Sequence, residues 1–385
     1  MPDSNKPSPR TGATPPPLEH RPTSLVPPSD APVPPSPHQR VAGPRKVDVP
    51  GFQSRLDELV KECGGDPQTT DGRLVSDMLL TALKLVTDGR DTGELKLMCT
   101  AFKELRYAYN VFAQHSTARR VSIFGSARTP PDHPDYKSAV DFSRMIAAAG
   151  WGVITGAGDG IMKAGHEGPG RESSFGLSIR LPFENNANSV IKGDPKLINF
   201  RYFFTRKLMF VSQCDAVVCY PGGFGTQDET FEALTLVQTG KGAMMPVVYL
   251  EGEGHGYWKS FDEFVRRALL EGRFISPEDT HLYYIAKNPA DAVAHIQQFY
   301  RNFHSARYFK DDLIIRLNRR LRDKDVAELN RRFAALVKSG EITQRGPYDA
   351  ETDALDLPRI AFTHTRRQIG VVRQLIDAIN EFDVA

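Results

Sequence analysis

Short apolar segments alternate with amphipathic segments of helical period between residues 121 and 303, and this alternation restricts the fold more than any other feature of the chain. The pattern predicts strands at 121–125, 151–155, 175–181, 216–220, 246–250 and 283–286. It predicts helices at 134–149, near Met162, and at 200–213, 226–239, 257–270 and 290–303. Strands that alternate with helices pair in parallel through right-handed crossovers, with helices on both faces of the sheet. We therefore expect an α/β fold with a Rossmann-like, doubly wound parallel sheet that binds ligands at the carboxyl ends of its strands.

Three segments flank this main domain of residues 119–304. Residues 1–50 contain 15 of the 28 prolines and no Phe, Trp or Tyr, so we expect a disordered tail that cannot offset its ordering entropy. Residues 51–118 keep a helical period without a strand pattern and predict an N-terminal helical layer that packs on the main domain. Residues 305–385 predict a small C-terminal α/β appendage, with strands at 313–317 and 359–363 and helices at 326–337 and 368–382.

Glycine-bearing loops follow three of the predicted strands, at 124–128, 155–162 and 221–229. Each glycine lacks a Cβ and allows positive φ, so backbone N–H groups can turn toward an anion. A helix that begins behind such a loop adds its dipole and its free N–H donors. The third loop, Pro-Gly-Gly-Phe-Gly-Thr-Gln-Asp-Glu, is the most specific because it is long, follows a strand and opens a helix.

The same helix start also allows a structural interpretation. Thr226 and Glu229 have the spacing of a capping box, in which the two side chains satisfy backbone N–H groups at the helix start. Asp228 and Glu232 add acidic charge near this turn, where the helix dipole favours carboxylates. The residues by themselves leave capping and catalysis equally open, although the preceding Pro-Gly-Gly-Phe-Gly exceeds what a helix start requires.

Two adjacent cations, Arg206 and Lys207, occupy the predicted helix at 200–213. Lys207 lies within its apolar arc and Arg206 at the border of that arc. Either they pair with buried carboxylates, because an unpaired buried charge is too costly, or their long side chains extend to water.

Composition excludes several classes of partner. A net charge of +2, from 49 basic and 47 acidic residues, gives no signature of nucleic-acid binding. We expect reduced core thiols from the four scattered cysteines, and no metal, because no His-x-x-x-His or Cys-x-x-Cys spacing occurs. The first residues lack an apolar stretch, which argues against a secretory signal, and no apolar run approaches about 20 residues, so we expect a cytoplasmic protein without a membrane span.

The segment from residue 121 to about 303 resembles the LOG ("lonely guy") family, often labelled lysine-decarboxylase-like. Residues 221–229 match its hallmark Pro-Gly-Gly-x-Gly-Thr-x-x-Glu at every fixed position, and the first two glycine loops and the Arg-Lys pair also fit. The helical layer and the segments 181–184 and 202–204 resemble the longer bacterial branch. The resemblance implies a catalytic pair of Arg206 and Glu229, with Lys207 and Glu232 near the site. It implies that the 5′-phosphate is held by Gly222, Gly223, Gly225 and Thr226, and that base and ribose are lined by Gly125, Ser126, Gly156, Gly158, Gly160 and Met162.

Members of this family are phosphoribohydrolases. The resemblance implies hydrolysis of AMP or a cytokinin riboside 5′-monophosphate to the free base and ribose 5-phosphate, without a cofactor, in a homo-oligomer. We do not expect lysine decarboxylation, because that chemistry needs pyridoxal phosphate on a Schiff-base lysine. Two alternatives remain: a non-catalytic nucleotide- or cofactor-binding sensor or carrier on the same fold, and a scaffold recruited through the Pro-rich tail and the C-terminal appendage.

Overall fold

The computed structural model describes residues 51–115, 119–180, 187–254, 256–349 and 351–382. The tail at 1–50 and the segment 181–184, on which two predictions fall, lie outside the described residues. The chain divides into two compact units, Met1–Leu95 and Lys96–Ala385. The first unit contains α1 (Phe52–Glu62), α2 (Thr70–Thr87) and the start of α3 (Thr92–Ala113).

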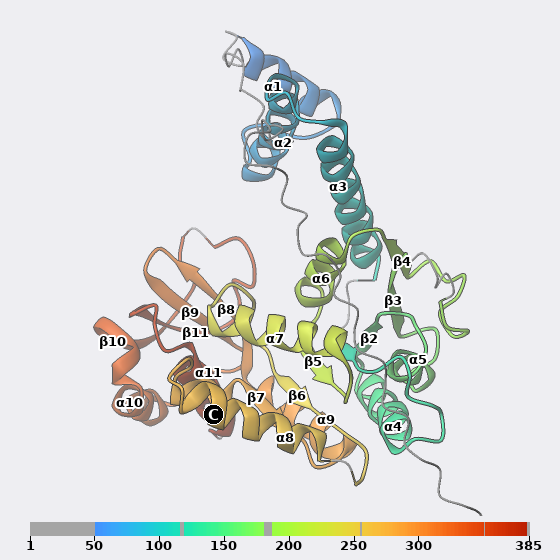
Figure 1. Cartoon of the computed structure of the whole chain (residues 1–385). Helices are drawn as coiled ribbons and strands as arrows, with labels where there is room; N and C mark the ends of the chain where they lie inside the picture. The colour runs from blue at the N-terminus through green and yellow to red at the C-terminus, as the bar shows by residue number, and fades with distance from the viewer. Residues whose placement is uncertain (1–50, 116–118, 181–186, 255, 350, 383–385) are drawn as a thin grey trace, which may run out of the picture. The chain divides into compact units, whose positions relative to one another are not determined.

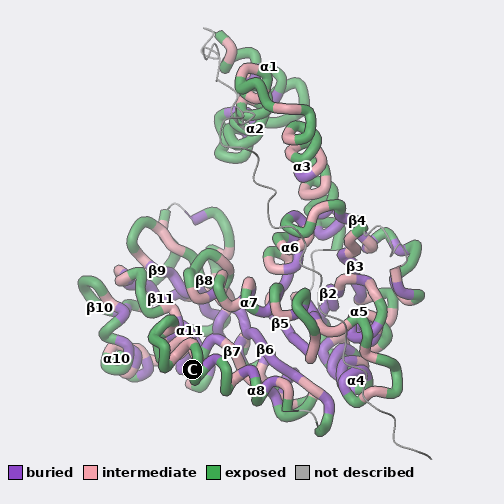
Figure 2. The backbone as a smooth tube through the Cα atoms, in the orientation of Figure 1, coloured by how far each residue is buried: buried purple, intermediate pink, exposed green. Residues whose placement is uncertain are grey.

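The helical period predicted for residues 51–118 is confirmed in these three helices. Thr69 caps α2, because its side chain accepts a hydrogen bond from the N–H of Gly72 at 3.1 Å. Much of α2 is exposed (Figure 2), and its exposed apolar residues include Leu74 and Met78. The C-terminal part of α3, by contrast, packs Val111 and Phe112 into the core of the second unit.

The second unit is built on a seven-stranded parallel sheet in the order β4-β3-β2-β1-β5-β6-β7 (Figure 1). The strands are β1 (Arg120–Phe124), β2 (Gly152–Thr155), β3 (Ser174–Ile179), β4 (Leu197–Phe200), β5 (Ala216–Cys219), β6 (Val247–Tyr249) and β7 (Tyr283–Ile285). The helices between and after them are α4 (Pro134–Ala148), α5 (Ile161–Glu167), α6 (Phe203–Ser212), α7 (Phe224–Gln238), α8 (Tyr257–Phe264) and α9 (Pro289–Phe299). The predicted Rossmann-like, doubly wound fold is confirmed.

Two separate apolar cores cover the two faces of this sheet. Alternate residues of β1 show the division: Ile123 packs with side chains of α4, α5 and α9, whereas Phe124 packs with side chains of α6, α7 and α8. Successive side chains of a strand point to opposite faces. A strand buried on both faces is therefore mostly apolar, and Val121, Ile123 and Phe124 made β1 predictable from the sequence.

Three strands were not predicted. β4 is a four-residue edge strand, and the helix expected to begin at residue 200 begins instead at Phe203. β8 (Phe303–Phe309) starts where the predicted helix was expected to end. β10 (Val337–Arg345) is an edge strand whose residues are mostly polar and exposed, so it lacks the apolar alternation that marks a strand.

The C-terminal appendage is a four-stranded antiparallel sheet in the order β10-β11-β9-β8, with β9 at Asp312–Leu317 and β11 at Arg359–His364. Helices α10 (Asp323–Arg332) and α11 (Ile369–Glu381) share a third apolar core with it. α11 packs closely on the 3₁₀ turn Pro277–His281, where a Cβ added to Gly370 would lie 2.2 Å from the carbonyl oxygen of Glu278.

A buried carboxylate joins two buried arginines in this appendage. Glu351 accepts hydrogen bonds from Nη2 of Arg316 at 2.7 Å and from its Nε at 3.1 Å, and lies 3.3 Å from Nε of Arg359. All three side chains are nearly fully buried, whereas Asp353, which also contacts Arg316, is 62% exposed. Burial raises the pKa of Glu351, but the N–H of Tyr348 and the two guanidinium groups outweigh it, so this pKa is lowered.

Replacing Glu351 with Ala is expected to reduce the free energy of unfolding by about 3–5 kcal/mol, because two buried guanidinium groups lose their shared carboxylate. Urea titration followed by circular dichroism measures the loss. The matched control is Asp353→Ala, which removes an exposed partner of the same arginine and is expected to cost about 1 kcal/mol or less. Equal losses in the two variants would contradict the assignment.

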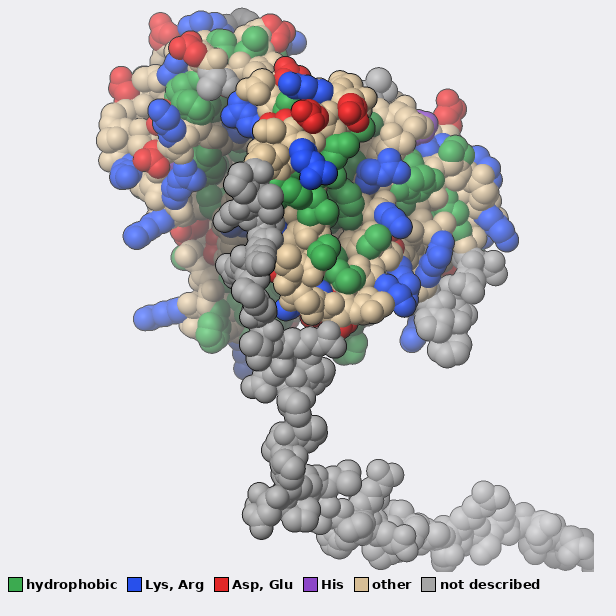
Figure 3. All heavy atoms as spheres, turned by 90° about the horizontal axis from the view of Figure 1, so that it is seen from above, with side chains coloured by type: hydrophobic (Ala, Val, Ile, Leu, Met, Phe, Trp, Pro, Cys, Tyr) green, Lys and Arg blue, Asp and Glu red, His purple; other side chains and the backbone are tan. Residues whose placement is uncertain are grey.

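No described helix has the length and apolar character that a membrane span requires. On the face seen in Figure 3, basic and acidic side chains both occur, with apolar side chains between them, as the near-neutral net charge of +2 predicts.

Candidate functional site

A cavity of about 670 Å³ opens where the loops after β1, β2 and β5 meet. This is the carboxyl-end position at which doubly wound sheets bind ligands. Most of the predicted site residues line it: Gly125, Ser126, Gly156, Gly158, Met162, Arg206, Gly223, Gly225, Thr226 and Glu229. Four predicted residues do not line the cavity and instead contact the loops and side chains around it. They are Gly160, Gly222, Lys207 and Glu232.

Aromatic side chains that the sequence did not assign to the site also line this cavity. Phe124 and Phe210 lie at its wall and are buried, whereas Phe203 and Phe224 are 53% and 97% exposed. Phe224 is the variable residue of the hallmark motif. Its ring contributes almost nothing to the core and is presented beside the cavity instead.

The loop after β2 is held by a buried histidine. His166 on α5 contacts the hydroxyl of Thr155 at 3.0 Å and the amide of Asn188 at 3.2 Å. Thr155 accepts from the N–H of Ala157, and Asn188 donates to the carbonyl of Gly158 at 3.0 Å. Burial lowers the pKa of His166 to about 4, so it is neutral at pH 7. The network fixes the turn at Ala157, whose φ of 63° is unfavourable for a residue with a Cβ.

Gly160 connects the loops after β1 and β2. Its φ is +60°, and an added Cβ would lie 2.3 Å from the carbonyl oxygen of Ser126. The next residue, Ile161, donates its N–H to that same carbonyl at 3.0 Å. Gly160 is therefore required for the packing of the two loops and does not itself line the cavity.

The loop after β5 leads directly into α7, and the capping-box interpretation is wrong. The N-cap residue is Gly223, and Thr226 is the third residue of the helix and not its cap. The first intrahelical bond runs from the N–H of Gln227 to the carbonyl of Gly223 at 3.1 Å. Within the described residues, no acceptor is recorded for the N–H groups of residues 224–226, which begin a helix beside the cavity.

The glycines of this loop have different reasons to be glycine. A Cβ on Gly222 would lie 2.1 Å from Oγ1 of Thr226, so the fold itself excludes a side chain there. A Cβ on Gly223 or Gly225 would meet no atom within 4 Å, and neither residue has a positive φ. Because both line the cavity, the close approach of a ligand is a reason for glycine that protein packing does not supply.

Helix α6 presents Arg206 to the cavity. Its start is fixed by Glu104 of α3, which accepts hydrogen bonds from the N–H of Arg201 at 2.6 Å and from the hydroxyl of Thr205 at 2.7 Å. The guanidinium of Arg206 lies 5.2 Å from the ring centre of Phe203 and 5.5 Å from that of Phe210. These rings hold the cation by cation–π attraction in a largely buried position.

Arg206 faces Glu229 across the cavity. The closest guanidinium nitrogen and carboxylate oxygen are 4.0 Å apart, and the side chains are only 13% and 8% exposed. Burial raises the pKa of Glu229 to about 7, and the positive charges of Lys207 and Arg206 limit the rise. Burial lowers the pKa of Arg206, and Glu229 opposes that effect. A carboxyl group whose pKa lies near neutrality can exist in either protonation state at the site.

Lys207 points to the other carboxylates of the same turn. Its Nζ lies 2.8 Å from Asp228 and 3.2 Å from Glu232. Burial by itself would lower the pKa of Lys207, but the hydrogen bonds to these carboxylates raise it. The interpretation in which both cations extend to water is therefore wrong, because both are largely buried and face carboxylates of α7.

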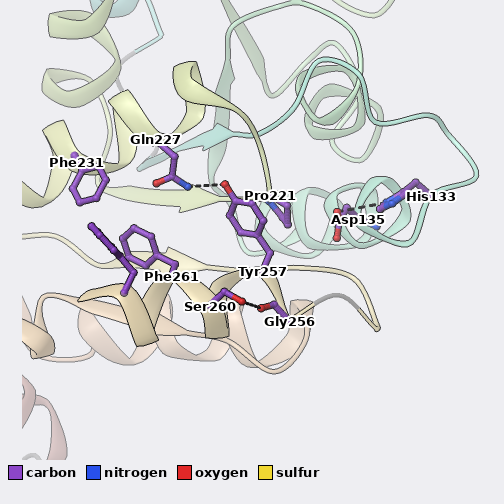
Figure 4. A pocket seen from close by; sticks show the side chains of 10 residues that line it. His133, Asp135, Pro221, Gln227, Phe231, Gly256, Tyr257, Ser260 and Phe261 are labelled. Carbon is purple, nitrogen blue, oxygen red and sulfur yellow. Dashed lines mark hydrogen bonds and ion pairs between the residues drawn. The ribbon is translucent and has the colours of Figure 1, made fainter. Parts of the chain in front are cut away.

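A second cavity, of about 820 Å³, is lined by other residues of α7 and by α8 (Figure 4). Gln227 and Phe231 of α7 face Tyr257 and Phe261 of α8 across it, with His133 at one end. This cavity was not predicted from the sequence, because its aromatic residues have the spacing of core residues.

The prediction that the four cysteines are buried in the core holds for two of them. Cys214 and Cys219 are buried thiols whose pKa burial raises to about 12, but Cys63 and Cys99 are exposed. Among the described residues, no group of three or more His, Cys, Asp or Glu side chains is arranged to hold a metal ion.

Pyridoxal phosphate does not fit the cavity residues. That cofactor requires a lysine for its Schiff base, and no lysine is among the described residues that line the cavity. Lys207 follows the lining residue Arg206 in the sequence, but its ammonium group forms ion pairs with Asp228 and Glu232. The residues therefore do not support lysine decarboxylation.

The protein is an α/β protein whose cavity lies at the carboxyl end of its parallel sheet. A glycine-bearing loop and a buried carboxylate–guanidinium pair line this cavity. Residues 156–296 match the family model described as "Possible lysine decarboxylase". The resemblance to the LOG family is confirmed by this match and by the relatives below.

Two plant proteins are among the similar relatives. "Probable cytokinin riboside 5'-monophosphate phosphoribohydrolase LOGL2" of Oryza sativa subsp. japonica is 25% identical over 189 residues, which cover 48% of this chain and 74% of that protein. "Cytokinin riboside 5'-monophosphate phosphoribohydrolase LOG3" of Arabidopsis thaliana is 26% identical over 191 residues, covering 48% and 85%. Among solved structures, the molybdenum cofactor binding protein from Rippkaea orientalis is similar at a TM-score of 0.35 and 21% identity, covering 47% of this chain and 96% of that one.

The carboxyl group of Glu229 is expected to titrate near pH 7, and Lys207→Met is expected to move its pKa higher still, because a positive charge that favours the ionised form is removed. Carbon-13 NMR of the side-chain carboxyls, with Glu229→Gln for assignment, measures both values. Lys338→Met, at an exposed position on β10, is the control and should leave the titration unchanged. An ordinary glutamate pKa in the wild-type protein would contradict the burial argument.

Proposed function

We propose that this protein hydrolyses the N-glycosidic bond of a nucleoside 5′-monophosphate, of the AMP or cytokinin riboside 5′-monophosphate type, to the free base and ribose 5-phosphate. The observation that carries the proposal is the desolvated pair of Arg206 and Glu229, which lines the same cavity as the glycine loop. A site that only binds a phosphate has no need of a buried carboxylate near the anion.

The loop after β5 is assigned to the 5′-phosphate. Its support is the set of backbone N–H groups at the start of α7, for which no protein acceptor is recorded among the described residues. The open space at Gly223 and Gly225 supports the same assignment, since a phosphate can approach the backbone there. Thr226 adds a hydroxyl beside the cavity.

Glu229 is assigned to the reacting carbon of the ribose. Cleavage of the N-glycosidic bond leaves its electron pair on the departing base and develops positive charge on the ribose ring. The ionised carboxylate stabilises that charge and accepts a proton from the water that forms the new C–O bond. The departing base takes up one proton from the solvent, and Glu229 releases its proton to the solvent. In a largely buried site the stabilisation is stronger than in bulk water.

Arg206 is assigned to orienting the substrate and Glu229. Its closest nitrogen lies 4.0 Å from the carboxylate, so the two charges attract each other without a direct hydrogen bond. The guanidinium therefore keeps N–H donors for a ribose or phosphate oxygen. Gly125, Ser126, Gly156, Gly158 and Met162 are assigned to the wall that contacts the base and ribose.

Free-base release from a panel of nucleoside monophosphates, including AMP and isopentenyl-AMP, tests the proposal. Wild type is expected to release base, and Glu229→Gln to lower kcat by roughly 10²- to 10⁴-fold, the usual contribution of a positioned acid–base group. Glu263→Gln, at an exposed position of α8, is the matched control. Nucleotide binding by wild type without any base release would instead establish the non-catalytic sensor or carrier.

Gly225→Ala is expected to preserve the melting temperature and to weaken binding of ribose 5-phosphate at least about tenfold. The added methyl group meets no protein atom within 4 Å and favours the helix, but it occupies the approach of the phosphate. Differential scanning calorimetry and isothermal titration measure the two effects. Unchanged affinity would remove this loop from the phosphate site.

A further inference from the structure

One tyrosine joins the second cavity to the loop after β5. Tyr257 is the first residue of α8, and its hydroxyl donates a hydrogen bond to the carbonyl of Gly222 at 2.6 Å. The same hydroxyl accepts a hydrogen bond from Nε2 of Gln227 at 2.7 Å (Figure 4). Tyr257 itself lines the second cavity only, so its hydroxyl reaches the loop from behind.

The position of this tyrosine is fixed by its surroundings. Gly256, at φ +63°, makes the turn into α8, and the N–H of Tyr257 donates to the carboxylate of Glu251 at 2.8 Å. Its ring packs edge-on against Trp258, which is fully buried and donates to the carbonyl of Leu250. The hydroxyl therefore acts from a rigid support and not from a mobile side chain.

Gln227 determines the direction of the phenolic proton. A tyrosine hydroxyl has one proton to donate, and it can accept hydrogen bonds at the same time. Because Gln227 donates to the oxygen of Tyr257, that single proton is directed to the carbonyl of Gly222. Gln227 and Tyr257 thus act in series on one carbonyl group.

Holding that carbonyl also orients the next N–H. The peptide between Gly222 and Gly223 is trans, and in a trans peptide the C=O and N–H groups point to opposite sides. With the carbonyl directed toward Tyr257, the N–H of Gly223 points away from α8, and Gly223 lines the first cavity. Two adjacent glycines would otherwise let this peptide rotate with little steric resistance.

We propose that Tyr257 is a positioning residue, which holds the Gly222–Gly223 peptide so that its N–H faces the phosphate of the substrate. The inference rests on the proposed function for the identity of the ligand. It adds that the phosphate loop is organised before the ligand arrives, by a residue that does not touch the ligand. Such preorganisation strengthens binding, because the loop is already ordered and no ordering entropy is lost when the ligand binds.

Tyr257→Phe in the full-length chain tests the proposal, since it removes one oxygen and keeps the ring. Isothermal titration with ribose 5-phosphate is expected to give about tenfold weaker binding, within the range of one well-placed hydrogen bond. Binding of adenine, which lacks a phosphate, is expected to be unchanged. Gln227→Met keeps the hydrogen bond from Tyr257 to Gly222 but removes the amide donor that directs the phenolic proton. It is expected to cause a smaller loss of affinity for ribose 5-phosphate.

Tyr283→Phe is the matched control, because it removes another partly buried tyrosine hydroxyl that bonds α8, at Asp262. It is expected to leave both affinities unchanged. Wild-type affinity for ribose 5-phosphate in Tyr257→Phe would overturn the positioning role, as would an equal loss for adenine, which indicates general disruption. Failure of the wild-type protein to bind ribose 5-phosphate would count instead against the proposed function.

Discussion

Two cations on consecutive residues of α6 meet three carboxylates on the first turns of α7, and the organisation of the site depends on this group of partly buried charges. Lys207 lies 2.8 Å from Asp228 and 3.2 Å from Glu232, whereas Glu229 faces Arg206 at 4.0 Å without a direct hydrogen bond. A buried carboxylate that is attracted but not hydrogen-bonded by its partner keeps a raised pKa. Lys207 thus balances the charge of Asp228 and Glu232, and the pKa of Glu229 stays raised.

This arrangement requires that both helices be held at their first turns. Glu104 fixes α6 from α3, and the loop after β5 fixes α7 through Gly222 and Thr226. Both helices pack on the same face of the sheet through buried side chains such as Phe210 and Ala233. Because protein interiors are close-packed, small displacements of either helix would alter the 4.0 Å separation of Arg206 and Glu229.

Sequence periodicity was sufficient for the central strands and for the loops that follow them. β1 and β5 are buried at every position and mostly apolar, and the carboxyl ends of parallel strands meet at one edge of the sheet. Sequence periodicity failed for β4 and β10, which are edge strands whose side chains do not all enter a core. It could not separate capping from ligand binding at Thr226, since that distinction depends on where α7 begins. Tyr257 and the network around His166 were missed because their partners are distant in sequence, and only the fold brings them together.

The exposed ring of Phe224 has a consequence for the thermodynamics of binding. This side chain stands 97% exposed at the start of α7, beside a cavity that Phe203 also borders with half of its surface open to water. A ligand or a moving segment that covers these rings removes apolar surface from water. Such an event carries a negative heat-capacity change, which grows with the area covered. The temperature dependence of the binding enthalpy would therefore report how far the mouth of the cavity closes, separately from the polar contacts at its base.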